Sequence, residues 1–160
     1  TLRIINTAAT LPVGDFPTIE EAQVSFDKAV ETLNNARRNE SEDNIKIAVS
    51  EAKRAGFVLG NATRTADGPM SMPVQAMRIG PAALVAIPVE AFCEIGIAVK
   101  GASPAEQTLF SGYTNGYMGY MPMADNFEEG GYEVVTTPMA AGAAEETIDV
   151  CTDAVKALWR

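Results

Sequence analysis

An α/β fold, with a mixed β-sheet covered by helices and an N-terminal helical hairpin, is predicted by two features of the sequence. Residues 19–38 and 41–59 each carry apolar side chains at helical spacing. In the second half, strand-like runs alternate with helical segments, which is typical of a sheet that packs helices against its faces. The length of 160 residues suits one domain of roughly 100 to 200 residues. We therefore expect a single domain over residues 1–160, with the hairpin region at 1–71 and the sheet and site loops at 72–160.

The first half is predicted to hold one short strand and the two helices. Residues 2–8 (LRIINTA) form a short apolar run that favours a strand, and the Pro- and Gly-rich stretch after it favours a loop. Thr18 precedes an acidic first turn and is expected to cap the first helix. Ser41 is expected to cap the second helix, and Gly60 to end it. The two helices are expected to pack as a hairpin.

The second half is predicted to alternate between strands and helices. Residues 84–88 (LVAIP) are apolar on both faces, so we expect this strand inside the sheet. Asp125 and Glu128 have capping-box spacing and are expected to start a short turn. Cys93 and Cys151 lie on apolar helical stretches, where a free cysteine is usually buried, and the sequence leaves a disulfide between them open. Strands are expected at residues 74–79, 84–88, 107–111 and 132–136, and helices at 90–100 and 143–158.

The composition excludes several classes of function. Lys and Arg number 12 against 21 Asp and Glu, a net charge of -9, and this field repels phosphate backbones and anionic lipid surfaces. No apolar run approaches the ~20 residues that cross a bilayer, so neither nucleic acid nor a transmembrane segment is expected. The sequence contains no histidine, so it can supply at most part of a centre that depends on imidazole. Because it begins at Thr1 without a methionine, we expect a processed or excised piece of a longer protein.

One carboxylate lies where an apolar strand is predicted to end and a helix to begin. Glu90 directly follows the run at residues 84–89. In α/β sheets ligands bind at the carboxyl ends of strands, so Glu90 is well placed for a functional role. A glutamate in the first turn also stabilises a helix through its dipole, and position alone favours this structural role.

A loop of tyrosines and glycines follows the strand predicted at residues 107–111. Residues 112–120 (GYTNGYMGY) interleave three tyrosines with three glycines. Glycine lets the backbone approach a ligand closely, and tyrosine brings an aromatic ring with a hydroxyl group. Such a loop can line a pocket, and its rings can equally pack over the edge of the sheet. The residues alone leave both interpretations open.

In their order and flanking residues, these motifs resemble the catalytic domain of the neutral/alkaline non-lysosomal ceramidase family. The resemblance runs from about residue 72 to the end of the sequence, and before that it is loose. It implies the C-terminal portion of that catalytic domain, an extracellular or periplasmic location, and hydrolysis of the amide bond of a ceramide or related N-acyl lipid by a zinc-bound water. The matching segments are residues 76–80 (AMRIG), 84–90 (LVAIPVE), 115–120 (NGYMGY) and 127–133 (FEEGGYE).

The resemblance also implies roles for individual residues. In that family zinc is held by two histidines from the first half of the catalytic domain, a glutamate at a Pro-Gly-Glu strand end and a tyrosine of an Asn-x-Tyr-x-x-Tyr loop. The glutamate falls on Glu90, after Val89 in place of the glycine, and the zinc-binding tyrosine falls on Tyr120. Asn115 and Tyr117 are implied to bind substrate. We therefore expect an incomplete catalytic centre, inactive alone, whose partner is the histidine-bearing N-terminal portion of the same domain.

Two alternatives stay open beside the ceramidase-like interpretation. An N-terminal threonine can use its own amine as a base, so Thr1 permits a self-processed amidase. The chain can also be a non-catalytic subunit or binding module whose methionines make adaptable apolar contacts. Cys93 is disfavoured as a nucleophile because the chain offers no histidine to activate it. The methionines concerned are Met72, Met77, Met118, Met121 and Met123.

Overall fold

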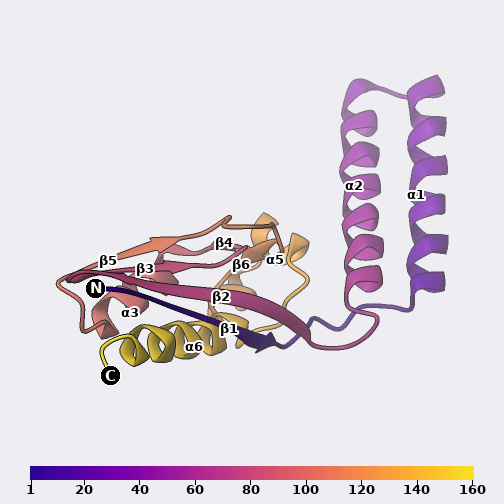
Figure 1. The fold of residues 1–160 in the computed structure, drawn as a ribbon. Coiled ribbons are helices and arrows are strands. Elements are labelled where there is room, and N and C mark those ends of the chain that lie inside the picture. Colours follow the sequence, from indigo (N-terminus) through magenta and orange to yellow (C-terminus); the bar gives the residue numbers. More distant parts are fainter. The chain divides into compact units, whose positions relative to one another are not determined.

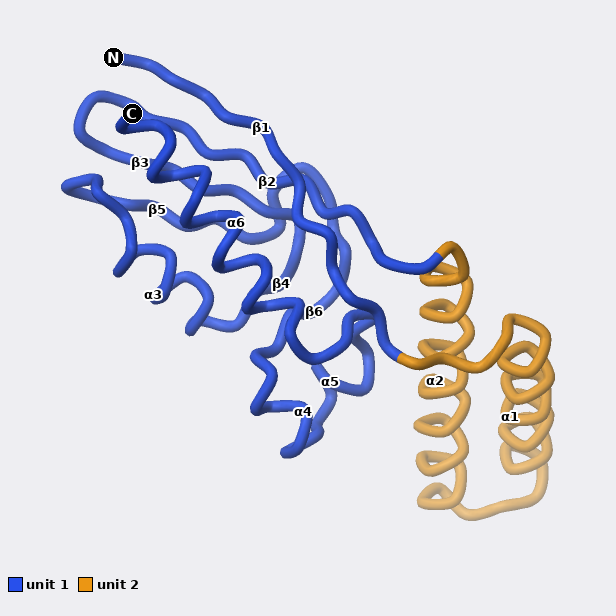
Figure 2. Tube along the Cα trace, turned by 90° about the horizontal axis from the view of Figure 1, so that it is seen from below, with its two compact units in different colours: residues 1–14, 68–160 blue, residues 15–67 orange.

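The computed structural model describes the whole chain, residues 1–160, which divides into two compact units. One unit holds residues 1–14 and 68–160, and the other holds residues 15–67 (Figure 2). The N-terminal strand therefore belongs with the sheet and not with the hairpin region in which the sequence analysis placed it. The expectation that the chain folds as a single domain stays a prediction.

The second unit is the predicted helical hairpin, made of α1 (Ile19–Asn39) and α2 (Glu42–Arg64) (Figure 1). Thr18 caps α1 as expected, because its side chain accepts a hydrogen bond from the Glu21 backbone while the Glu21 carboxylate accepts one from the Thr18 backbone. Ser41 occupies the N-cap position of α2, but its side chain makes no capping hydrogen bond.

Gly60 does not end the second helix, contrary to the sequence prediction. The helix continues to Arg64, and Gly60 lies inside it on an exposed face. A glycine terminates a helix when it takes a left-handed conformation just after the last turn, and Gly60 has no positive φ. Tertiary packing of the hairpin carries the helix through this position.

Replacing Gly60 with alanine should stabilise the hairpin. A Cβ added at Gly60 would meet no atom within 4 Å, and glycine inside a helix costs roughly 0.5–1 kcal/mol relative to alanine. Urea unfolding followed by circular dichroism should show a gain of that size. Gly56→Ala is the matched control and should gain less, because its Cβ would lie 3.3 Å from the Phe26 ring. Lower stability of Gly60→Ala would contradict this account.

The first unit contains a four-stranded mixed sheet, which confirms the predicted fold class. The strand order is β1 (Leu2–Leu11), β2 (Met70–Ile79), β3 (Ala82–Ala86) and β5 (Gln107–Ser111). Strand β2 runs antiparallel to both β1 and β3, whereas β3 and β5 run parallel. The helices α3 (Cys93–Ala102) and α6 (Ala143–Ala157) lie on one face of this sheet (Figure 1).

The core lies between that face and the two helices. Alternate residues of the strands point into it, as the pleat requires, and apolar side chains of α3 and α6 meet them. Met72 and Met121 are fully buried here, so both act as core residues. The other large side chains that are fully buried are Leu11, Val74, Val85, Ile87, Val89, Ile95, Val99, Met139, Val155 and Leu158.

The predicted strand at 132–136 is wrong, because these residues form the short helix α5 (Tyr132–Thr136). The β-branched pair Val134–Val135 favours a strand locally. Gly131 instead turns the chain with φ 107, and the Val135 backbone N–H donates a hydrogen bond to the Gly131 carbonyl, which closes a helical turn. Local propensity is overridden here by the turn that precedes it.

The start of one helix and the capping of another also differ from the predictions. The helix expected from residue 90 begins at Cys93, because β4 (Glu90–Ala91) pairs instead with β6 (Tyr120–Met121) in a two-stranded parallel sheet. The capping box expected at Asp125 is absent from α4 (Asn126–Glu129). Asp125 has helical backbone angles, φ −63 and ψ −30, whereas a capping side chain needs a non-helical N-cap residue.

Both cysteines are free thiols. Cys151 is buried as predicted, and burial raises its pKa to about 12. The prediction that Cys93 is buried is wrong, since it begins α3 and is exposed. A hydrogen bond with Glu94 raises the pKa of the Cys93 thiol, which disfavours the thiolate that a nucleophile needs. None of the helices in the chain combines the length and the apolar character needed to cross a membrane.

Candidate functional site

Glu90 is held between the two ends of the tyrosine loop. On one side the Tyr113 backbone N–H donates to the Val89 carbonyl at 3.1 Å. On the other side the Glu90 N–H donates to the Gly119 carbonyl at 3.0 Å. Residues 112–119 therefore wrap around the segment that carries Glu90, and they fix its backbone at the carboxyl end of the sheet.

Glu90 and Tyr120 are direct neighbours in the small sheet. They are register partners in the parallel pair of β4 and β6, and the Glu90 backbone N–H bonds to the residue just before Tyr120. Paired residues on adjacent strands project to the same face. The structure therefore brings together the two residues that the family resemblance assigns to a metal site.

The valine that replaces the family's glycine needs no unusual backbone. The non-glycine residues with positive φ are Tyr113 and Asn115, and Val89 is not among them. Its side chain is fully buried in the core. The Pro-Val-Glu sequence therefore presents Glu90 without strain at the preceding residue.

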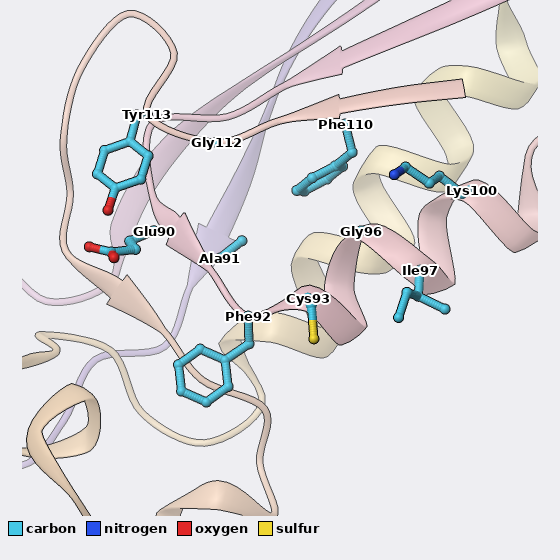
Figure 3. Close-up of a pocket in the computed structure, with 10 residues that line it drawn as sticks. All are labelled: Glu90, Ala91, Phe92, Cys93, Gly96, Ile97, Lys100, Phe110, Gly112 and Tyr113. Carbon is cyan, nitrogen blue, oxygen red and sulfur yellow. The ribbon is translucent and has the colours of Figure 1, made fainter. Parts of the chain in front are cut away.

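Phenol groups surround the Glu90 carboxylate. The Tyr117 hydroxyl lies 3.4 Å from Glu90 Oε2 and donates to it. Tyr113 also hydrogen-bonds to Glu90, and its hydroxyl points at the carboxylate in Figure 3. The rings of Tyr113 and Tyr117 stack, with centroids 5.5 Å apart and planes 7° from parallel. The carboxylate thus has an ordered aromatic wall on one side.

Tyr113 was missed among the predicted site residues, whereas Asn115 was included among them. Tyr113 belongs to the same glycine-tyrosine loop, but it lies outside the family motif that selected the other positions. Asn115 is exposed at the tip of the loop with φ 61. The alternation of glycine and tyrosine in this loop, and not the family motif, is the sequence feature that could have identified Tyr113.

The backbone of Tyr113 is strained. Its φ is 54, a left-handed value that is uncommon for a bulky side chain and costs of order 1–3 kcal/mol. The neighbouring loop is tied down because the Thr114 hydroxyl donates to Ser111 Oγ at 3.0 Å. Gly112 allows the loop to pass close to the Val89 carbonyl, which a Cβ would approach to 2.8 Å.

The phenols near Glu90 hold their protons strongly. The hydrogen bond to the Glu90 carboxylate is the main cause that raises the pKa of Tyr113 to about 12. For Tyr120, burial is the main cause of a raised pKa, and the negative charge of Glu90 adds to it. A metal that binds the Tyr120 oxygen must therefore displace a proton, so its binding strengthens as the pH rises.

Glu90→Gln should lower the pKa of Tyr113 from about 12 toward its ordinary value of 10.0. The raised pKa means that the hydrogen bond stabilises the fold below pH 10.0 and is lost as the pH rises through about 12. Ultraviolet titration of tyrosinate in the wild type and in Glu90→Gln measures the shift. Identical titration curves for the two proteins would show that Glu90 does not control Tyr113.

A pocket of about 350 Å³ opens beside Glu90 (Figure 3). Glu90 and Tyr113 lie at one end, and residues of α3 form the other end, where Lys100 places a cation near the ring of Phe110. No group of three or more His, Cys, Asp or Glu side chains is arranged to hold a metal ion. The remaining lining residues are Ala91, Phe92, Cys93, Gly96, Ile97 and Gly112.

Thr1 lies at the opposite end of the sheet from Glu90. Its carbonyl accepts a hydrogen bond from Gly80 at 2.8 Å, in the turn that precedes β3, whereas Glu90 follows the far end of that strand. The structure therefore separates Thr1 from the pocket and from the tyrosine loop.

Comparison with known proteins finds similar solved structures, among them two ceramidases. No protein-family model matches the sequence, and no curated protein matches it. A neutral ceramidase from Pseudomonas aeruginosa is 27% identical, with a TM-score of 0.51 over 56% of this chain. A ceramidase complexed with C2 is 26% identical, with a TM-score of 0.52 over 57% of this chain. Each match spans only 15% of the ceramidase chain. Over more than half of its length, this chain is therefore built like part of a neutral ceramidase.

Proposed function

We propose that this chain is the C-terminal portion of a ceramidase-like amide hydrolase and supplies two oxygen ligands, from Glu90 and Tyr120, to a zinc ion. The observation that carries the proposal is the register of β4 with β6, which makes these two residues neighbours. The likeness to solved ceramidases at 27% and 26% identity supports it. The other two ligands are histidines of a second portion of the catalytic domain.

The chemistry of the donor set suits zinc but does not complete its site. Carboxylate oxygen is a common zinc ligand, and a bound metal lowers the pKa of a phenol enough to deprotonate it. Zinc sites have three or four protein ligands, so Glu90 and Tyr120 need partners. When bound, zinc polarises the amide carbonyl and supplies hydroxide near neutral pH.

The remaining residues of the loop orient Glu90 and receive the substrate. Tyr113 and Tyr117 donate hydrogen bonds to the carboxylate, which fixes its direction in the way that outer-shell partners orient metal ligands. Tyr117 is 54% exposed, and with Asn115 it offers polar groups to a bound substrate. Phe92, Ile97 and Phe110 line the neighbouring pocket and suit the apolar part of a ceramide or another N-acyl lipid. We infer an extracellular or periplasmic location from the same likeness.

Zinc analysis tests the proposal directly. The partner is the part of the Pseudomonas aeruginosa neutral ceramidase that lies outside the match, here called the ceramidase partner portion, co-expressed with this chain. We expect about one zinc ion per complex and none on the isolated chain. One tightly held zinc ion on the isolated chain would contradict the proposed ligand set.

Amide hydrolysis by the same complex separates this proposal from a self-processed amidase. Thr1→Ala should leave turnover unchanged, because Thr1 lies at the far end of the sheet from Glu90. Loss of turnover in Thr1→Ala would favour the amidase that uses the N-terminal amine.

A further inference from the structure

One face of the four-stranded sheet carries no helix of its own unit. Both α3 and α6 pack on the opposite face (Figures 1 and 2). The register of the strands shows which residues share the uncovered side. The central row across all four strands is Ile4, Met77, Leu84 and Leu109, and the row beside it is Leu2, Ile79, Ala82 and Gln107.

These rows carry no charged residue, and all of their members except Gln107 are apolar. Met77, Ala82 and Leu84 are half-buried, and the other members are exposed. Leu2, Ile79 and Leu109 are 66%, 57% and 64% exposed. Charged residues make up 21% of the chain, yet every position on this side of the four strands is uncharged, while the helix-covered side carries Arg3 and Arg78. A sheet surface that faces water would be expected to include charged side chains.

The residue types indicate that this side is covered. A sheet with one side in water alternates apolar residues on its packed side with polar residues on its outer side, whereas the outer positions here include Leu2, Ile4 and Leu109. Contiguous exposed apolar patches on a soluble domain mark surfaces that bind another protein. We call Leu2, Ile4, Met77, Ile79, Leu84 and Leu109 the open sheet face.

We propose that the open sheet face docks the histidine-bearing portion of the ceramidase-like catalytic domain, through an uncharged apolar surface of that portion. The inference rests on the proposed function. The match spans only 15% of each solved ceramidase chain, so those proteins contain ample polypeptide to cover the face.

The direction of the strands links this docking to the site. Parallel strands β3 and β5 both end next to the loop that holds Glu90, so a partner lying along the open sheet face reaches the site at its edge. A second copy of this chain fits less well. Each copy carries a net charge of -9, so two copies repel, and neither offers a histidine.

Charged substitutions on the open sheet face test the docking. Leu109→Lys and Ile4→Lys should each weaken binding of the ceramidase partner portion at least ten-fold in titration calorimetry. Val24→Lys is the control, because it adds the same charge at a 69% exposed position of α1. Its binding should equal that of the wild type. Thermal unfolding of all three variants should match the wild type, since these side chains lie outside the core.

The outcomes separate docking from metal binding. Wild-type affinity of Leu109→Lys and Ile4→Lys would overturn the docking surface while leaving the zinc proposal standing. The docking surface would also be overturned if the wild type failed to bind the partner portion. The same would follow if the wild type self-associated and Leu109→Lys abolished that self-association. Glu90→Gln should bind the partner portion normally, and a Glu90→Gln complex that kept its zinc would refute the proposed function without touching the docking surface.

Discussion

Glu90→Gln should remove zinc from the complex with the ceramidase partner portion and lower amide hydrolysis by more than about 100-fold. Changes to residues that only orient a metal ligand already cost 10–100-fold, and this change replaces a charged ligand with a neutral amide of the same shape. The backbone hydrogen bonds that hold the segment do not involve the side chain, so the fold should persist. Zinc content and turnover, measured on the same preparation, check the prediction.

Two further variants control for charge and for orientation. Glu94→Gln removes an exposed carboxylate in the first turn of α3 and should leave zinc content unchanged. Tyr117→Phe removes the hydroxyl that donates to Glu90 and should cost less than Glu90→Gln, about 10-fold to 100-fold. Equal loss of zinc in Glu94→Gln would mean that the effect is one of net charge and not of ligation.

Gly112→Ala should destabilise the sheet unit by about 1–3 kcal/mol, the usual cost of forcing an extra methyl group into a packed position. The new Cβ would lie 2.8 Å from the Val89 carbonyl oxygen, and this backbone atom cannot move aside without breaking its hydrogen bond to Tyr113. The substitution should also displace Tyr113 and weaken its contact with Glu90. Urea unfolding gives the loss of stability, and tyrosinate titration gives the change at Tyr113.

Gly116→Ala is the matched control for Gly112→Ala in the same loop. Its Cβ would lie 3.5 Å from Pro88 Cβ, an ordinary van der Waals distance, and its φ is not positive. We expect a change in the free energy of unfolding within about 0.5 kcal/mol, as for most surface substitutions. If Gly112→Ala proved as stable as Gly116→Ala, the loop would not depend on close approach to Val89.

The helices and sheet strands were predictable where one periodicity dominates. Strand-like runs identified parts of β2, β3 and β5, and helical spacing identified α1, α2 and α6. The prediction failed where neighbouring geometry decides. Gly60 resembles a helix stop in sequence, but the hairpin carries the helix past it, and Val134 and Val135 favour a strand that the turn at Gly131 does not permit.

The site was predictable only in part. Glu90 could be located from the end of an apolar strand, whereas Tyr120 was selected by the family motif alone. The two residues pair through β4 and β6, which have two residues each. Strands this short show no periodicity in the sequence, so the pairing could not be predicted. Tyr113 has a left-handed backbone, a conformation that is uncommon for tyrosine and that its sequence does not indicate.

X-ray absorption at the zinc edge of the complex tests most directly whether Glu90 and Tyr120 bind the metal. We predict nitrogen and oxygen neighbours at about 2.0–2.2 Å without sulfur, and loss of an oxygen neighbour in Tyr120→Phe. A zinc spectrum that stays the same in Tyr120→Phe and in Glu90→Gln would place the metal elsewhere and contradict the proposed site.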